Sequence, residues 1–175
     1  MPPKTAIIYA TVDGQTLKIC TRLAQILREH QHAVEMVAIE NFSGSLEGFE
    51  KVVIASSIRY GQHNARITDF ILHNSQALAE KKGVFVSVNL VARKPERATP
   101  ETNPYVKKFL GSIGWVPDMV GVFAGMLDYN RYSLSDRLLI QLIMLITRGP
   151  VRSKEPIEYT NWGEVEAFGS TISKL

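Results

Sequence analysis

Short apolar runs recur along the chain at strand length. Each run holds four or five residues, and almost every side chain in it is apolar. Such runs are typical of a parallel sheet that is covered on both faces, because neither face of the strand then meets water. The sequence therefore predicts five strands: Ala6–Ala10, Val34–Ala38, Val52–Ala55, Val84–Val88 and Val120–Ala124.

Segments with helical periodicity lie between these runs. In the first of them Leu17, Cys20 and Leu23 recur every three residues on one apolar face. The predicted helices are Gln15–His30, Ala65–Ala79, Asn103–Gly111 and Asn161–Leu175. Because strands alternate with helices, we predict an α/β three-layer sandwich whose five-stranded parallel sheet has the order 2-1-3-4-5. In this order ligands bind beyond the carboxyl ends of the strands.

Two predicted connections are too long to be plain linkers. One runs from Asn89 to about Thr102 and the other from Gly125 to about Tyr159, whereas most connections hold about four to six residues. Long loops in compact domains are usually functional, so we expect both to contribute to a site.

The second connection contains an apolar helical segment, Leu134–Thr147, which Ser135 is placed to cap. At about 1.5 Å per residue this helix is about 20 Å long, too short to span the roughly 30 Å hydrocarbon layer of a membrane. It could lie on a membrane surface between flanking basic residues, pack on the domain's own core, or form the seam of a homo-oligomer. The flanking basic residues are Arg131, Arg137, Arg148, Arg152 and Lys154.

Composition indicates one globular domain over residues 1–175, with an insertion at about 125–159. Hydrophobic residues make up 45% and charged residues 21% of the 175 residues. The single cysteine, Cys20, excludes an internal disulfide and a paired metal motif, so we expect a buried thiol and no metal site. The start of the chain lacks the pattern of a secretory signal, and we expect a cytoplasmic protein.

The positive charge is concentrated in the later part of the chain. Ten basic and five acidic residues lie between Val91 and Lys154, although the net charge of the whole chain is only +3. A basic region of this kind favours carboxylate ligands or an anionic membrane surface. We expect no nucleic-acid partner, because no zinc-finger spacing or aromatic-rich basic strand is present.

A candidate phosphate loop, Thr11-Val-Asp-Gly-Gln-Thr16, links the first predicted strand to the first helix. The two threonine hydroxyls and the free N–H groups at the helix start can surround a phosphate, and Gly14 lets the backbone approach it. The alternative is an ordinary helix cap formed by Asp13 or Thr11. A mononucleotide fits this loop better than a dinucleotide or a triphosphate, because neither Gly-x-Gly-x-x-Gly nor Gly-Lys-Ser/Thr occurs.

Two further loops follow the third and fourth predicted strands. In Ser56–His63, Tyr60 could stack on an aromatic ring or be a half-buried aromatic, and His63 could be an acid or base or a surface or capping residue. The loop after the fourth strand begins Ser87-Val-Asn-Leu-Val-Ala-Arg-Lys-Pro-Glu96. No Ser-His-Asp, Cys-His or paired-carboxylate arrangement stands out, so the catalytic residues stay unassigned.

Several of these motifs together resemble one enzyme family. Thr-x-x-Gly-x-Thr after the first strand resembles the phosphate loop of flavodoxins. The ten residues from Ser87, together with Ala55-Ser-Ser-Ile-Arg-Tyr-Gly61 and Asp13-Gly-Gln-Thr16, resemble the flavodoxin-type, menaquinone-dependent protoporphyrinogen oxidases of bacterial haem biosynthesis. The similarity extends to Tyr159-Thr-x-Trp162 and so covers almost the whole chain. Asp13, Ala10 and Val12 depart from the polar residues common in such loops.

The resemblance implies a flavodoxin-like fold that binds FMN. The implied FMN-binding residues are Thr11, Val12, Asp13, Gly14, Gln15, Thr16, Ser57, Ile58, Arg59, Tyr60, Gly61, Ser87, Val88, Asn89 and Leu90. It also implies oxidation of protoporphyrinogen IX, with menaquinone or ubiquinone as electron acceptor, at the inner face of the cell membrane. The helix of the insertion should border the flavin site.

The implied substrate carries two propionates, which guanidinium groups match well. The candidates for carboxylate binding are Arg59, Arg93, Arg131 and Arg137. The alternative functions are an NAD(P)H-fed quinone reductase, an electron-transfer flavodoxin and a non-catalytic FMN-binding module. Flavodoxins are usually acidic, whereas this chain has a pI of about 9.0, which disfavours an electron-transfer flavodoxin.

Overall fold

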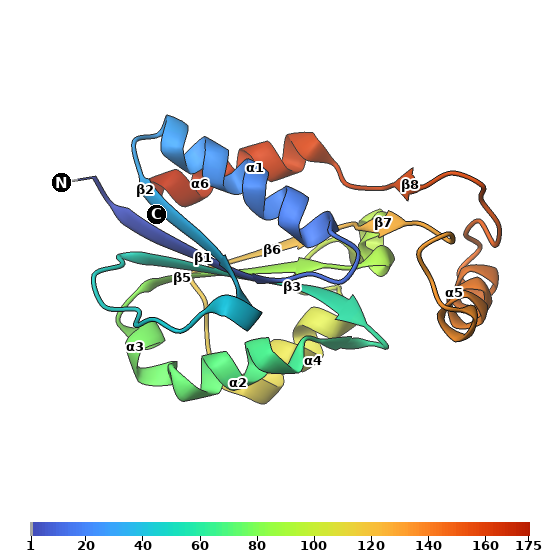
Figure 1. The fold of residues 1–175 in the computed structure, drawn as a ribbon, viewed down its shortest axis with the longest axis horizontal. Helices are drawn as coiled ribbons and strands as arrows, with labels where there is room; N and C mark the ends of the chain where they lie inside the picture. The colour runs from blue at the N-terminus through green and yellow to red at the C-terminus, as the bar shows by residue number, and fades with distance from the viewer. Residues whose placement is uncertain (1) are drawn as a thin grey trace.

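The computed structural model describes residues 2–175 and is built around one parallel sheet (Figure 1). Its parallel strands are β1 (Lys4–Ala10), β2 (Ala33–Ala38), β3 (Lys51–Arg59), β5 (Lys82–Val88) and β6 (Met119–Phe123). They are hydrogen-bonded in the order β2-β1-β3-β5-β6. Counted along the chain without the short β4, this is the order 2-1-3-4-5, so the predicted fold class is confirmed.

Helices cover both faces of the sheet and complete the three layers (Figure 1). On one face lie α1 (Gln15–Glu29) and α6 (Trp162–Lys174), and on the other lie α2 (Ala65–His73), α3 (Ser75–Ala79) and α4 (Pro104–Ile113). Two apolar cores fill the space between the layers. Along β3, Val52 and Ile54 enter one core while Val53 and Ala55 enter the other. Both faces of the central strands β1, β3 and β5 are therefore buried, as their apolar sequences predict, whereas the edge strand β2 is partly exposed.

Cys20 lies on the buried face of α1, in the core, as predicted. Its surroundings are apolar, and burial raises the pKa of its thiol well above the ordinary value. A thiol in this position is therefore a small apolar core group.

Element boundaries differ from the prediction where polar side chains intervene. The predicted helix Ala65–Ala79 is two helices, α2 and α3, which meet at Asn74. The side-chain amide of Asn74 donates to the carbonyl of Phe70, and such a local bond competes with continuation of the helix. A two-residue strand, β4 (Gln62–His63), pairs antiparallel with β3 and makes six strands in the sheet.

Both long connections have regular structure. The first contains two short 3-10 helices, η2 (Leu90–Arg93) and η3 (Pro95–Arg97). Asn89 begins η2 because its side chain accepts a hydrogen bond from the backbone N–H of Ala92. This connection is therefore held in a defined shape at the end of β5.

The second connection leaves and rejoins the domain through a short antiparallel pair, β7 (Met126–Leu127) and β8 (Ile157–Glu158). Between them, α5 (Leu134–Ile146) lies at one end of the molecule, apart from the layers of the sandwich (Figure 1). Its N-cap is Ser133, whose hydroxyl accepts from the N–H of Asp136, so the expected cap at Ser135 is wrong.

Most apolar side chains of α5 face outward. Within the helix only Asp136 and Met144 are buried, while Leu134 and Ile146 are 81% and 72% exposed. The helix therefore packs on the domain's own core through one stripe only, where Met144 joins Leu127 and Tyr129, and most of its other apolar side chains are exposed. A membrane surface and a second copy of the chain remain as predicted partners for it.

Candidate functional site

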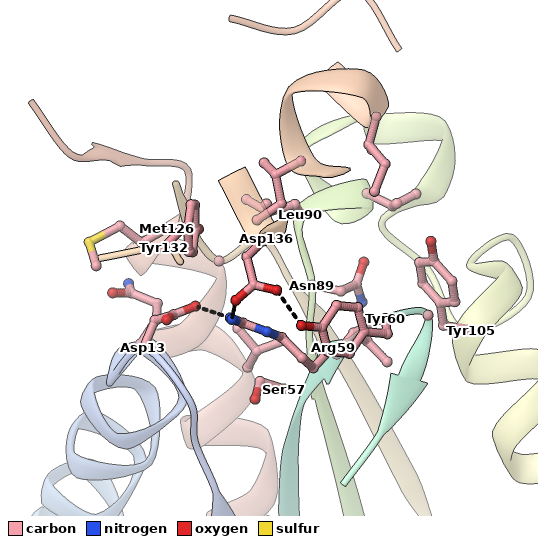
Figure 2. Close-up of a pocket in the computed structure, with 18 of the residues that line it drawn as sticks. Asp13, Ser57, Arg59, Tyr60, Asn89, Leu90, Tyr105, Met126, Tyr132 and Asp136 are labelled. Carbon is pink, nitrogen blue, oxygen red and sulfur yellow. Dashed lines mark hydrogen bonds and ion pairs between the residues drawn. The ribbon is translucent and has the colours of Figure 1, made fainter. Parts of the chain in front are cut away.

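A cavity of about 330 Å³ lies where β1, β3 and β5 end (Figure 2). The segments that follow these three strands form one part of its wall, and the insertion and Tyr105 of α4 form the rest. Of the fifteen predicted cofactor residues, twelve line the cavity. The exceptions are Val12, which is exposed, Gly14, which shapes the loop, and Ser87, which is buried behind the wall. Parallel strands bring these segments together because their carboxyl ends share one edge of the sheet.

The loop after β1 has the geometry of an anion site. Gly14 adopts a left-handed conformation with φ of 85°, and its N–H donates to the hydroxyl of Thr11 at 3.0 Å. No side chain caps α1, so the alternative that Asp13 or Thr11 caps this helix is wrong. The first N–H groups of α1 consequently have no side-chain partner and carry the positive end of the helix dipole.

Two buried polar atoms in the same loop lack hydrogen-bond partners. They are the hydroxyl oxygen of Thr16 and the side-chain carbonyl oxygen of Gln15, whose amide nitrogen donates to Thr160 at 2.8 Å. Buried polar atoms are rarely left unpaired, so these two atoms indicate a position that can bind a polar ligand. The uncapped helix start and the Thr16 hydroxyl together fit a phosphate group.

An ion-pair cluster joins the phosphate loop, the end of β3 and α5 (Figure 2). The guanidinium of Arg59 lies 3.6 Å from the carboxylate of Asp13 and 2.5 Å from that of Asp136. The hydroxyl of Tyr60 donates to the other oxygen of Asp136. This cluster, which we call the Arg59 cluster, fastens the N-terminal turn of α5 to the two loops.

The two carboxylates of the Arg59 cluster titrate differently. Hydrogen bonds from Tyr60 and Ser133, together with Arg59, hold the pKa of Asp136 below its ordinary value. Burial raises the pKa of Asp13, although the charges of Arg59 and Arg131 oppose this effect. The side chain of Asp13 points to Arg59. This ion pair offsets the negative charge that Asp13 brings to the candidate phosphate loop.

Tyr60 stands at the rim of the cavity. Its backbone is in the left-handed region with φ of 50°, followed by Gly61 with φ of 74°, so the chain turns sharply there before β4. The side chain is 68% exposed, so its interpretation as a half-buried aromatic is wrong. Tyr105 from α4 also lines the cavity on this side, close to Gly61 (Figure 2).

His63 is buried beneath the cavity and does not line it, and its interpretation as a surface residue is wrong. Its ring packs against Phe85 and Phe109, and its Nε2 is 2.9 Å from the hydroxyl of Ser87. Burial lowers the pKa of His63 to about 3, so the imidazole is neutral near neutral pH. The hydroxyl of Ser87 also accepts from the amide of Asn89, which lines the cavity.

The four candidate arginines are separated by the structure. Only Arg59 lines the cavity. Arg93 donates to the hydroxyl of Thr147 and ties η2 to the end of α5, while Arg131 donates to the carbonyl of Asp13 at 2.8 Å. Arg137 is exposed on α5. A common carboxylate site made by all four is therefore absent from this arrangement.

The insertion supplies most of the cavity residues that the sequence did not single out; the others are Val91 of η2 and Tyr105 of α4. From β7 and the loop before α5 come Met126 and Tyr132, and from α5 itself come Asp136, Leu139, Ile140, Ile143 and Met144. The helix borders the cavity. Its expected place beside the flavin site stays a prediction. The apolar sequence of this segment predicted a helix with a function. It did not predict which face of the helix would line the cavity, because almost every position from Leu138 to Ile146 is apolar.

Among residues 2–175, no helix combines the length and the apolar character that are needed to cross a membrane.

Comparisons with known proteins agree with this geometry. The family model of the flavodoxin domain matches residues 6–154. A protein of Escherichia coli strain K12 named protoporphyrinogen IX dehydrogenase (quinone) is 39% identical over 173 residues, which are 98% of this chain and 96% of that protein. A protein of Leishmania major with the same name is 39% identical over 99% of this chain and 76% of its own length.

Solved structures of flavodoxin type share the fold. An archaeal flavodoxin superposes with a TM-score of 0.56 at 12% identity, over 98% of this chain and 96% of its own. The rubredoxin oxygen:oxidoreductase of Desulfovibrio gigas superposes with a TM-score of 0.54 at 14% identity, over 99% of this chain and 36% of its own. From the family model and the two close relatives, the chain belongs to the flavodoxin-domain family and, within it, to the family of the protoporphyrinogen IX dehydrogenases (quinone).

Proposed function

We propose that this protein binds FMN in the cavity and oxidises protoporphyrinogen IX to protoporphyrin IX in haem biosynthesis, with a quinone as electron acceptor. The observation that carries the proposal is the uncapped start of α1 beside the unpartnered hydroxyl of Thr16, at the mononucleotide position of a flavodoxin domain. The reaction follows from the name that the relatives bear at 39% identity.

The residues that would hold FMN come from three loops. Thr11, Thr16 and the first N–H groups of α1 would bind the phosphate, whose charge the helix dipole favours. The segments Ser57–Gly61 and Ser87–Leu90 would contact the ring, with the side chains of Asn89 and Ser87 fixing the shape of the second segment. When bound, FMN supplies two-electron redox chemistry, and the six-electron oxidation of the macrocycle then needs three turnovers.

The protein would orient the macrocycle and exclude water from it. The macrocycle is flat and apolar, and its two propionates require cations. Arg59 carries the cation that lines the cavity, although Asp13 and Asp136 neutralise it in this structure. His63 is not placed to act as a base, because it is buried away from the cavity wall and burial lowers its pKa to about 3.

We further propose that α5 attaches the protein to a membrane surface. Most of its outward side chains are apolar. Basic residues stand near both of its ends: Arg131, Arg137, Arg148, Arg152 and Lys154. Its own acidic residue, Asp136, is turned inward to Arg59. An apolar face with cations at its ends is the pattern of a helix that lies at anionic lipid headgroups.

The function is tested by an anaerobic assay of the purified yellow protein. Protoporphyrinogen IX and a naphthoquinone are supplied, and the fluorescence of protoporphyrin IX is followed. We expect porphyrin to form in step with quinone reduction, and none to form without quinone. Oxidation of NADPH by the same preparation, with no porphyrinogen turnover, would instead make the protein a quinone reductase. Bound FMN with neither activity would make it a binding module.

A further inference from the structure

Three stripes of side chains run along α5, because residues four apart lie on the same side of a helix. The inner stripe consists of Asp136, Ile140 and Met144. Met144 is fully buried and packs with Leu127 and Tyr129, while Asp136 belongs to the Arg59 cluster. The inner stripe therefore fixes the rotation of α5 relative to the domain.

The outer stripe consists of Leu134, Leu138, Leu142 and Leu145. These four leucines are exposed, from 53% at Leu142 to 81% at Leu134. None of them lines the cavity. In the proposed function this stripe is the face that contacts lipid.

The third stripe lies between these two and consists of Leu139 and Ile143. Their side chains line the cavity and also reach the surface of the protein. Both line the cavity, yet they are 39% and 37% exposed. Leu90 and Val91 of η2 line the same cavity and are only half buried. The cavity is therefore open along this flank of α5, directly beside the outer stripe.

We propose that Leu139 and Ile143, together with Leu90 and Val91, form an apolar slot through which the hydrocarbon chain of a quinone passes from the membrane surface into the cavity. The proposal rests on the proposed function, in which a quinone is the electron acceptor. It adds the route and the residues by which that acceptor reaches the site.

The chemistry of the slot favours a hydrocarbon chain over the macrocycle. Beyond the first turn of α5, the cavity-lining side chains of this helix are all apolar: Leu139, Ile140, Ile143 and Met144. They offer no partner to a propionate, and a buried carboxylate without a partner is costly. The only cation that lines the cavity, among the residues described, is Arg59 at the other end of the inner stripe.

The test compares two quinones that share a ring. One is a methyl-naphthoquinone without a chain, and the other carries a long isoprenoid chain on the same ring. The double variant Leu139→Trp with Ile143→Trp narrows the slot. We expect its ratio of KM for the chain-bearing quinone to KM for the chainless quinone to rise about tenfold, as loss of contact with about two methylene groups would cause. A matched control, Leu72→Trp with Val116→Trp, changes two exposed apolar residues outside α5 and the cavity and should keep the original ratio.

A second variant guards against a folding defect. Leu139→Ala with Ile143→Ala removes contacts without adding bulk, and the ratio should again rise, by a smaller factor. Vesicle binding and FMN content should match those of the unmodified protein in both variants. An unchanged ratio in both, or a rise in KM for protoporphyrinogen IX alone, would overturn the slot. Failure of the unmodified protein to reduce either quinone would instead refute the proposed function.

Discussion

At the scale of single residues, Thr16 decides whether the loop after β1 is an anion site. Its hydroxyl is buried and unpartnered beside an uncapped helix start, so its role depends on a ligand. Gly14 contributes differently, because φ of 85° is strained for any residue with a Cβ.

The first prediction therefore concerns Thr16→Val combined with Gly14→Leu. We expect the double variant to lose its yellow colour on purification, because a hydrogen bond to a charged phosphate is worth about 1.5–3 kcal/mol and the backbone of the loop is distorted as well. FMN content per chain is measured from absorbance after denaturation. The control is Thr21→Val on the exposed side of α1, where the hydroxyl donates only to the carbonyl of Leu17. Full FMN content in the double variant would place the phosphate elsewhere.

The second prediction concerns His63 and pH. Its pKa is about 3 in the folded protein and 6.5 ordinarily, so below pH 6.5 the unfolded chain takes up a proton that the folded chain excludes. The stabilising contribution is thus present above pH 6.5 and is lost as the pH falls toward 3, at about 1.4 kcal/mol per pH unit.

Urea unfolding at several pH values between 7 and 4 measures this slope. His63→Gln should flatten it, whereas His73→Gln, at an exposed position on α2, should leave it unchanged. Some slope should persist in the first variant, because burial also lowers the pKa of His32. An identical slope in His63→Gln and the unmodified protein would contradict the buried, neutral assignment.

At the scale of elements, α5 is held to the domain by few side chains. Met144 and the Arg59 cluster anchor its inner stripe, and Arg93 holds its C-terminal end through Thr147. Each anchor joins segments that are far apart in the sequence. Loss of one anchor should therefore loosen α5 without unfolding the sheet.

The third prediction concerns the anchor at Asp136. Asp136→Asn removes the charge that pairs with Arg59, and we expect faster amide hydrogen exchange confined to α5 and to the segment Ser57–Gly61. Asp69→Asn, on the exposed side of α2, is the control. The pKa of Asp136 is lowered, so the same loosening should appear in the unmodified protein only as the pH falls below the ordinary carboxyl value of 3.8. Unchanged amide exchange in α5 would show that Met144 and Arg93 hold the helix to the domain without the ion pair of Asp136.

The limits of sequence-based prediction also lie at this scale. Most strands were predictable because burial on both faces leaves continuous apolar runs. The position of the loop after β1 at the cavity was predictable because it follows from strand order, whereas its binding of a phosphate stays a prediction. The break at Asn74 and the strand β4 depend on single hydrogen bonds and on a left-handed Tyr60, which leave no periodic signal. The Arg59 cluster could not be predicted from the sequence, because Asp13, Arg59 and Asp136 meet only after the insertion folds against the loops at the carboxyl ends of β1 and β3.

At the scale of the whole molecule, the fourth prediction concerns membrane binding. Leu138→Glu with Leu142→Glu places charge on the outer stripe of α5. We expect loss of co-sedimentation with anionic vesicles, and a thermal melt that is unchanged because both side chains are exposed. Binding of the unmodified protein should weaken as salt is raised, because the basic residues at the ends of α5 are screened. Leu72→Glu on α2 is the control.

Two results would contradict the membrane assignment. Vesicle binding that survives in the double variant would move the lipid contact away from α5. The second result would be that neither protein binds vesicles, while the unmodified protein is a dimer in size-exclusion chromatography and the double variant is a monomer. The outer stripe would then contact a second copy of the chain.

The pairing of β7 with β8 also bears on how such an enzyme can arise. Met126 lies opposite Glu158 and Leu127 opposite Ile157, so the insertion leaves and re-enters the domain at adjacent points. A segment with adjacent ends can be gained, exchanged or lost in one genetic event without shifting any strand of the host sheet. An ancestral flavodoxin could thus acquire this helical insertion in a single step, and natural variation in this family should concentrate between β7 and β8.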